Sequence, residues 1–225
     1  MNTLAEVVTA LRGGGVVGIP TDTVYGLAVL PDVRGSTSAL FALKQRPDSL
    51  SLPVLVPDLA AAVDLVGALS PDALAMATSC WPGPLTIVVV RPPRSRAASF
   101  DLGADQATIG LRCPDHAVAL EVLRATGPLA VTSANHHGEP PLTEAAAVGA
   151  VFGAGVAAVL DGGTCDGSPS SVVSCANGRV EVLREGPISA QHLRDLLGRG
   201  LITSDHGRRA ARTGPAGSSS QLGQR

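Results

Sequence analysis

Aromatic residues are scarce in this chain: they make up 2% of its 225 residues, and there is one tryptophan and one tyrosine. Hydrophobic residues nevertheless reach 45%, so a core has to be built from Val, Leu, Ile and Ala. This composition favours closely packed helices on a sheet. It argues against a reader of single-stranded RNA, because such proteins stack bases on aromatic side chains.

Lysine is rarer still, since Lys44 is the only lysine among 17 basic residues. A lysine carries a compact ammonium on a flexible stem, which suits a single phosphate or carboxylate oxygen, whereas arginine presents a planar fork. In a chain that otherwise uses arginine, one lysine indicates a position where arginine will not serve. The alternative is the chance retention of one surface lysine.

Clustered cysteines and long apolar runs are also missing. Four cysteines lie far apart, without a C-x-x-C pair and without histidines at zinc-ligand spacing: Cys80, Cys113, Cys165 and Cys175. No basic segment followed by an apolar run opens the chain, and no apolar stretch reaches the roughly 18 residues of a membrane span. We therefore expect a soluble, cytoplasmic protein with reduced thiols and no membrane partner.

Charge divides the chain into two unequal parts. The formal net charge is −2, but residues 199–225 hold five arginines against the single acid Asp205, which leaves −6 on residues 1–198. We expect one folded domain over 1–198 and an Arg-rich, disordered tail over 199–225. The acidic balance of the folded part excludes a general nucleic-acid surface but is compatible with a local basic cleft.

Short apolar runs alternate with helix-like segments throughout residues 1–198, which predicts an α/β fold with helices flanking a twisted sheet. Close strand spacing near residues 156–184 predicts that this sheet mixes parallel and antiparallel pairs. Helices are expected to begin at Thr3, Ser36, Asp58, Ser70, Asp115, Thr143 and Ser189. Strands are expected over 16–19, 53–56, 85–90, 107–111, 129–131, 156–160, 171–174 and 180–183, with a loop over 20–27.

Three clusters of small polar residues adjoin predicted strands. Thr21-Asp22-Thr23 follows the first strand, Thr132 to Asn135 follows a later one, and Ser170-Ser171 precedes another. Each cluster alone could be a helix cap or a turn. Together they predict one shared polar pocket, because ligands of open α/β sheets bind in the crevice at strand ends.

Cations accompany these clusters. Arg112 and Arg184 end two predicted strands, and Lys44 and Arg46 lie at a predicted helix end. Each arginine could simply be solvated, but four cations in one cleft would suit a nucleoside triphosphate. The chain has no Walker loop, no G-x-G-x-x-G after a strand, no G-x-S-x-G and no H-E-x-x-H. His136-His137 lacks a carboxylate partner and is interpreted as a solvated pair.

The sequence resembles the YrdC-like threonylcarbamoyl-AMP synthase family, in a short form with a single domain. The resemblance rests on blocks that occur in the family's order over about residues 5–198: P-T-D-T-V-Y-G-L at 20–27, K-Q-R-P at 44–47, W-P-G-P-L-T at 81–86, G-L-R-C-P at 110–114, T-S-A-N at 132–135, D-G-G at 161–163 with S-S-V-V at 170–173, and R-E-G at 184–186. It implies a YrdC-like fold with a positively charged cavity.

The resemblance also implies an activity, that of a nucleotidyltransferase. L-threonine, bicarbonate or CO2, and ATP with Mg²⁺ would give threonylcarbamoyl-AMP and pyrophosphate. A separate transferase complex would then move the threonylcarbamoyl group to the adenosine next to the anticodon of certain tRNAs. The Arg-rich tail could add salt-sensitive contact with tRNA.

Site residues carry over position by position. Lys44 and Arg46 would be catalytic and contact the phosphates and the carbamate. L-threonine would be bound by Thr21, Thr23, Arg112 and Thr132, and ATP by Lys44, Arg46, Ser133, Asn135, Ser171 and Arg184. The sequence departs from the family at His137, where serine is expected, and at Ser171, where threonine is commoner.

Two other functions remain open at this point. The first is a non-catalytic RNA-binding module on the same fold, which the −6 charge and the few aromatics disfavour. The second is a carbamoyl-transfer domain of the hydrogenase-maturation type, which uses carbamoyl phosphate. Proteins of that type carry zinc-finger and acylphosphatase-like regions, and this sequence shows neither.

Overall fold

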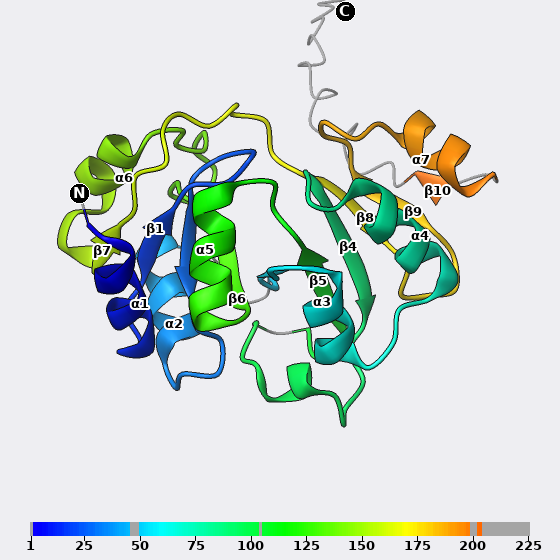
Figure 1. The fold of residues 1–225 in the computed structure, drawn as a ribbon, viewed down its shortest axis with the longest axis horizontal. Coiled ribbons are helices and arrows are strands. Elements are labelled where there is room, and N and C mark those ends of the chain that lie inside the picture. Colours follow the sequence, from blue (N-terminus) through cyan, green and yellow to red (C-terminus); the bar gives the residue numbers. More distant parts are fainter. Residues whose placement is uncertain (1, 46–49, 104, 199–201, 204–225) are drawn as a thin grey trace, which may run out of the picture.

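Residues 2–45, 50–103, 105–198 and 202–203 are described by a computed structural model of the chain. Their strands form one sheet: β1 (Val17–Ile19), β2 (Gly26–Val29), β3 (Val54–Leu55), β4 (Leu85–Val90), β5 (Thr108–Arg112), β6 (Leu129–Ser133), β7 (Ala158–Val159), β8 (Ser171–Ser174), β9 (Glu181–Arg184) and β10 (Ile202–Thr203). Their order across the sheet is β10-β9-β8-β4-β5-β3-β6-β2-β1-β7 (Figure 1).

The sheet is mixed, which confirms the predicted fold class. Strands β1 and β7, β3 and β5, β4 and β8, and β9 and β10 pair in parallel, and the remaining neighbours are antiparallel. Among the described strands, β3 lies between the two halves and has two residues, with Val54 opposite Leu111 on one side and Ala130 on the other. The sheet therefore has a narrow waist at its centre.

The helices begin where the sequence predicts, with two exceptions. They are α1 (Leu4–Arg12), α2 (Ser36–Lys44), α3 (Leu59–Val66), α4 (Pro71–Cys80), α5 (Ala117–Thr126), α6 (Ala145–Phe152) and α7 (Ala190–Leu197). Thr3 and Glu6 form a complete capping box, and Asp58, Ser70 and Ser189 each cap their helix through the side chain. Two expected starts are wrong by one residue, because His116 rather than Asp115 is the N-cap of α5 and Glu144 rather than Thr143 is the N-cap of α6, and neither N-cap makes a side-chain bond.

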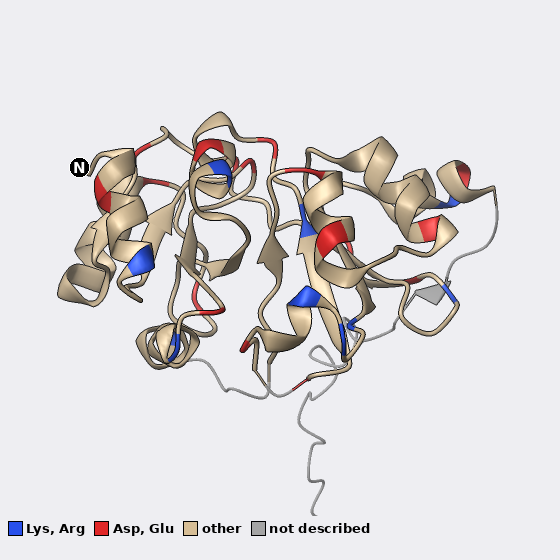
Figure 2. Cartoon of the chain, turned by 60° about the horizontal axis from the view of Figure 1, so that its bottom comes forward, with Lys and Arg blue, Asp and Glu red and all other residues tan. Residues whose placement is uncertain are grey.

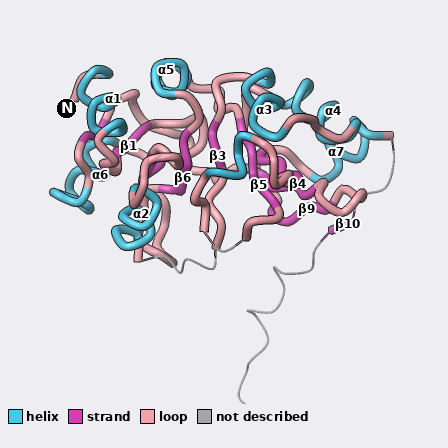
Figure 3. The backbone as a smooth tube through the Cα atoms, turned by 90° about the horizontal axis from the view of Figure 1, so that it is seen from below, coloured by secondary structure: helices cyan, strands magenta, loops and turns pink. Residues whose placement is uncertain are grey.

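Helices cover the two halves of the sheet unequally. Figures 1 and 3 show α1, α5, α3, α4 and α7 on one face, whereas α2 and α6 lie on the other face over the half that contains β1, β2 and β6. In β4, Leu85, Ile87 and Val89 are buried in the core, while Thr86 and Val88 line a cavity on the opposite face. The second face of the β4–β5–β8 half is thus open to a ligand.

Two strands depart from the sequence prediction. Residues 20–27 are not all loop, because β2 begins at Gly26 and pairs with both β1 and β6. The tail expected over 199–225 contains β10, whose backbone pairs in parallel with the edge strand β9. The rest of that tail lies outside the described residues.

Charges are interspersed over the elements rather than gathered into one patch of a single sign (Figure 2). In the part of the chain that the structure describes, no helix is long and apolar enough to cross a membrane.

Candidate active site

A cavity of about 420 Å³ opens on the face of the sheet opposite α3 and α4, at the waist, and its lining comes from both halves of the sheet. Thr21 and Thr23 reach it from the loop between β1 and β2, Thr132 and Ser133 from the end of β6, and Ser170 from the residue before β8. The prediction that the three polar clusters share one pocket is confirmed. Their meeting depends on strand order, because β2 and β6 are neighbours and β8 lies beyond the waist.

Arg112 lies at the C-terminal end of β5, and its side chain lines this cavity at 7% exposure. Its Nε donates to the carbonyl oxygen of Gly83 (3.1 Å), Nη1 donates to Thr23 Oγ1 (3.1 Å), and Nη2 donates to Asp22 Oδ1 (2.5 Å). Burial lowers the pKa of Arg112, and the charge of Asp22 opposes that shift. A guanidinium has five N–H donors, so these bonds leave two for a ligand.

The hydroxyl groups of Thr21 and Thr23 have a fixed direction of donation. Thr21 Oγ1 lies 2.7 Å from the carbonyl oxygen of Val24, which can only accept, and 2.9 Å from Thr23 Oγ1. Thr21 therefore donates to Val24, and Thr23 donates to Thr21. Because Thr23 Oγ1 also accepts from Arg112, it can offer a ligand only a lone pair.

Lys44 ends α2 and is 2% exposed. Its Nζ lies 2.6 Å from Ser133 O, 3.3 Å from Ser133 Oγ, 3.0 Å from Asn135 O and 2.8 Å from Asn135 Oδ1. An ammonium has three donors, so these oxygens can use all of them. Lys44 thus holds the loop after β6 and is not among the residues that line the cavity. Arg46 lies outside the described residues.

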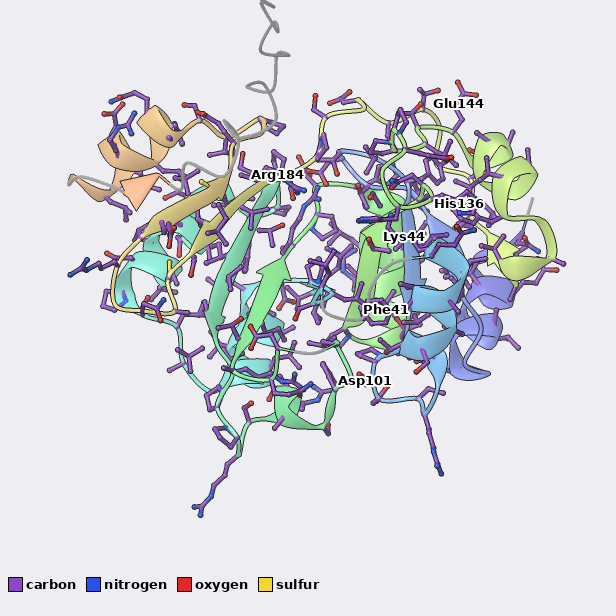
Figure 4. All side chains as sticks on the ribbon, turned by 180° about the vertical axis from the view of Figure 1, so that it is seen from behind. Phe41, Lys44, Asp101, His136, Glu144 and Arg184 are labelled. Atoms are coloured by element: carbon purple, nitrogen blue, oxygen red, sulfur yellow. The ribbon has the colours of Figure 1, made fainter. Side chains whose placement is uncertain are left out.

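Arg184 ends β9 on the far side of the cavity from β6 (Figure 4). Its Nε donates to Ser170 O (2.9 Å) and its Nη2 to Ser170 Oγ (3.2 Å), while Ser170 Oγ also pairs with Thr86 Oγ1 at 2.9 Å. Partial burial and the positive charge of Arg112 lower the pKa of Arg184. The two guanidiniums therefore repel each other, and an anion bound near both would relieve that repulsion.

Ser171, which the sequence assigns to ATP, does not line the cavity. It is fully buried, and its Oγ donates to Ile188 O (2.6 Å) and accepts from the N–H groups of Gly186 and Ile188 (both 3.0 Å). Strand alternation explains this, because adjacent residues point to opposite faces. The neighbouring Ser170 faces the cavity instead.

Asn135 organises the loop after β6 from within. Its Oδ1 accepts from Lys44 and from Ser133 Oγ (2.6 Å), and its Nδ2 donates to the carbonyl oxygens of His136 and Glu139, each at 2.8 Å. The exposed His137 joins α2 to the same loop, because its backbone N–H donates to Lys44 O (3.1 Å). Asn135 therefore shapes the cavity wall at Ser133 without lining the cavity.

Several residues at this site were not predicted from the sequence. Tyr25 lines the cavity, and its hydroxyl donates to Gly163 O (2.9 Å) and accepts from Gly162 N (3.1 Å), so it fastens the segment that leads to Ser170. Thr86 and Gly110 line the cavity from β4 and β5. The available signals were that Tyr25 is the single tyrosine and that Asp22 lies between two threonines.

Known proteins resemble the chain in sequence and in fold. A threonylcarbamoyl-AMP synthase of Bacillus subtilis is 34% identical over 197 residues, which are 87% of this chain and 56% of that protein. Another, from Chromohalobacter salexigens, is 36% identical over 160 residues, which are 71% of this chain and 84% of that protein. A protein from Mycobacterium tuberculosis is 35% identical over 196 residues, which cover 87% of this chain and 89% of its own length.

Solved structures show the same fold. Sua5 of P. abyssi complexed with L-threonine superposes with a TM-score of 0.79 at 27% identity, over 89% of this chain and 58% of that one. YciO of E. coli superposes with a TM-score of 0.76 at 22% identity, over 84% of this chain and 92% of that one. The model of the Sua5/YciO/YrdC family, which bears the description "Telomere recombination", matches residues 9–186. The chain belongs to the Sua5/YciO/YrdC family.

Proposed function

We propose that this protein is an L-threonylcarbamoyladenylate synthase, which converts L-threonine, bicarbonate or CO2, and ATP into threonylcarbamoyl-AMP and pyrophosphate. The observation that carries the proposal is the pair of guanidiniums, Arg112 and Arg184, that face one cavity whose walls also present hydroxyl groups. Relatives from B. subtilis and C. salexigens bear the name of this activity. Sua5 of P. abyssi has been solved with L-threonine.

The threonine end of the cavity lies at Arg112. Its two remaining N–H groups can donate to the carboxylate of L-threonine in a charge-assisted pair. Thr23 offers only a lone pair, so the group of the substrate next to it must be a donor, such as a hydroxyl or an N–H. Thr132 lines the same wall from β6, and Thr21 acts through Thr23.

The nucleotide end lies at Arg184 and Ser170, with Ser133 on the opposite wall. Apolar side chains of Leu52 and Val172 also line the cavity and suit the adenine or ribose faces. Lys44 supports Ser133 and Asn135, and it can reach a phosphate only by giving up one of its present oxygen partners. Arg46 keeps its proposed phosphate contact on the strength of the sequence resemblance alone.

The reaction brings an anion towards an anion. The carbamate oxygen forms a bond to the α-phosphorus of ATP, the bond from that phosphorus to the bridging oxygen breaks, and pyrophosphate leaves with the negative charge. Fixed positive charge around the phosphates lowers the barrier to such a step. Catalysis thus consists of positioning and electrostatics, with no protein base, and the enzyme is a nucleotidyltransferase.

Magnesium is proposed to arrive with ATP rather than to reside in the protein. Within the described ranges, no group of three or more His, Cys, Asp and Glu side chains could hold a metal ion. Mg²⁺ bound to nucleotides commonly keeps its water ligands and uses phosphate oxygens. The residues of the site therefore do not form a metal cage.

The product would be passed to a tRNA threonylcarbamoyl-transferase complex. The arginines of residues 199–225 are proposed to strengthen contact with tRNA, and such a contact would weaken steeply with salt. This part of the proposal comes from the charge of the sequence.

The proposed function is tested by tracing the carbon of bicarbonate into the nucleotide product. Purified protein is incubated with ATP, Mg²⁺, L-threonine and ¹³C-labelled bicarbonate, and the nucleotide products are analysed by mass spectrometry. We expect threonylcarbamoyl-AMP that carries one heavy carbon. A folded protein that yields no such product would contradict the proposal, and a product formed from carbamoyl phosphate instead would favour carbamoyl transfer.

A further inference from the structure

Asp22 has an unusual set of contacts for a buried carboxylate. Its Oδ1 accepts from Arg112 Nη2, with the two side chains only 12% and 7% exposed. Its Oδ2 is buried and has no hydrogen-bond partner within the described part of the chain. A buried acceptor without a partner costs free energy, so its retention calls for an explanation.

The explanation lies in what the carboxylate does to Arg112. A carboxylate that stabilised its own turn would bond to backbone N–H groups, but here Thr21 Oγ1 accepts from the N–H groups of Thr23 and Val24. Among the described residues, the polar contact of Asp22, in the loop between β1 and β2, is with the guanidinium of Arg112, which ends β5. Asp22 is also absent from the cavity lining, whereas Arg112 is part of it.

We propose that Asp22 is a positioning residue that fixes the orientation of the Arg112 guanidinium for the carboxylate of L-threonine. This inference rests on the proposed function. Three anchors hold the fork: Gly83 O at Nε, Thr23 Oγ1 at Nη1 and Asp22 Oδ1 at Nη2. Asp22 is the charged anchor of the three, so its hydrogen bond to the guanidinium is the charge-assisted one.

Electrostatics and positioning give opposite expectations when Asp22 loses its charge. Asp22→Asn removes a negative charge next to Arg112, beside a cavity that receives the carboxylate of L-threonine and the triphosphate of ATP, so electrostatic attraction alone predicts that both of these groups bind equally well or more tightly. Positioning predicts weaker binding of L-threonine alone, because ATP is held at the other end of the cavity. The direction of the change in KM therefore separates the two.

The test measures pyrophosphate release by wild type and Asp22→Asn with L-threonine and ATP varied separately. We expect the KM for L-threonine to rise about tenfold and the KM for ATP to stay within about twofold. The matched control is Asp64→Asn, which removes the same charge from the exposed Arg96–Asp64 pair and should change neither value.

A substrate analogue adds a readout that a structural role would not move. L-threoninamide lacks the carboxylate, and its inhibition constant is measured against L-threonine in both proteins. In wild type it should bind much more weakly than L-threonine, and Asp22→Asn should reduce that preference about tenfold. An equal loss for both compounds, or a lower KM for L-threonine, would overturn the inference.

Folding and function are checked separately. Thermal unfolding is measured for every variant, and if Asp22→Asn does not fold, Asp22→Glu keeps the charge but displaces it by a methylene and should give the same selective rise in the KM for L-threonine. An unselective loss in a folded Asp22→Glu protein would contradict the inference. If wild type shows no threonine-dependent pyrophosphate release, it is the proposed function that fails.

Discussion

Lys44 shows at the scale of one residue why the rarity of a side chain can be informative. Its ammonium lies among oxygens of Ser133 and Asn135 in a space that is almost closed to solvent. An arginine would place a larger planar group among those oxygens and could not point three donors at them from one atom. The sequence predicted that arginine would not serve here, but it could not predict that Lys44 contacts the loop rather than the cavity.

Replacing Lys44 should abolish activity and lower stability modestly. Lys44→Ala removes the donor to the buried carbonyl oxygen of Asn135 and one of the two donors to Ser133 O, and it releases the loop that forms the cavity wall at Ser133, so we expect a loss of about 1–3 kcal/mol in the free energy of unfolding and no pyrophosphate release. Lys44→Arg should retain little activity. Urea unfolding and pyrophosphate assays check both, and near-normal activity of the two variants would contradict the assignment.

Cys175 should make the fold sensitive to alkaline pH. Burial raises the pKa of its thiol from 9.0 to about 11. A raised pKa means that the unfolded chain ionises first, so the contribution is complete below about pH 9 and is lost as the pH rises to about 11. Wild type should lose about 1 kcal/mol more stability than Cys175→Ala between pH 8 and pH 10 in urea unfolding. Equal losses would contradict this.

Helix starts are the elements that the sequence predicts best, because their signals are local. Thr3, Asp58, Ser70 and Ser189 each bond to a backbone N–H three residues along, so a short stretch of sequence contains the whole interaction. Strand β2 was missed because the polar, turn-like residues that precede it made the whole segment 20–27 look like a loop, although β2 pairs with the nearby β1 as well as with the remote β6. The contact between Asp22 and Arg112 is equally remote, and no local pattern reveals it.

Two adjacent serines at the start of β8 have different roles, because Ser170 lines the cavity whereas Ser171 supports the fold. Ser170→Ala removes a hydroxyl that bonds to Thr86 and Arg184, so we expect the KM for ATP to rise several-fold with a small change in stability. Ser171→Ala leaves the N–H groups of Gly186 and Ile188 without their acceptor and should cost about 1–3 kcal/mol in the free energy of unfolding.

Steady-state kinetics and urea unfolding are measured for both serine variants, and each variant serves as the control for the other. If Ser171→Ala raised the KM for ATP while leaving stability unchanged, the sequence-based assignment of Ser171 to ATP would be right and the cavity assignment of Ser170 wrong.

At the scale of the whole molecule, strand order explains why the sequence identified the segments of the site but not which of their side chains face the cavity. Its walls come from the β1–β2 loop, from β5 and β6, and from the ends of β8 and β9, which the strand order brings to one waist. The motifs identified most of these segments through family resemblance. Which side chain of each segment faces the cavity depends on strand register, and register separates Ser170 from Ser171.

The two guanidiniums of Arg112 and Arg184 and the hydroxyl groups that line the same cavity are proposed to form a site for threonine-dependent adenylate synthesis. The most direct measurement is pyrophosphate release by the purified protein with ATP, Mg²⁺ and bicarbonate, in the presence and absence of L-threonine. We expect release that requires L-threonine and that is lost in Arg112→Met. Release that is independent of L-threonine, or none from a folded wild-type protein, would contradict the proposal.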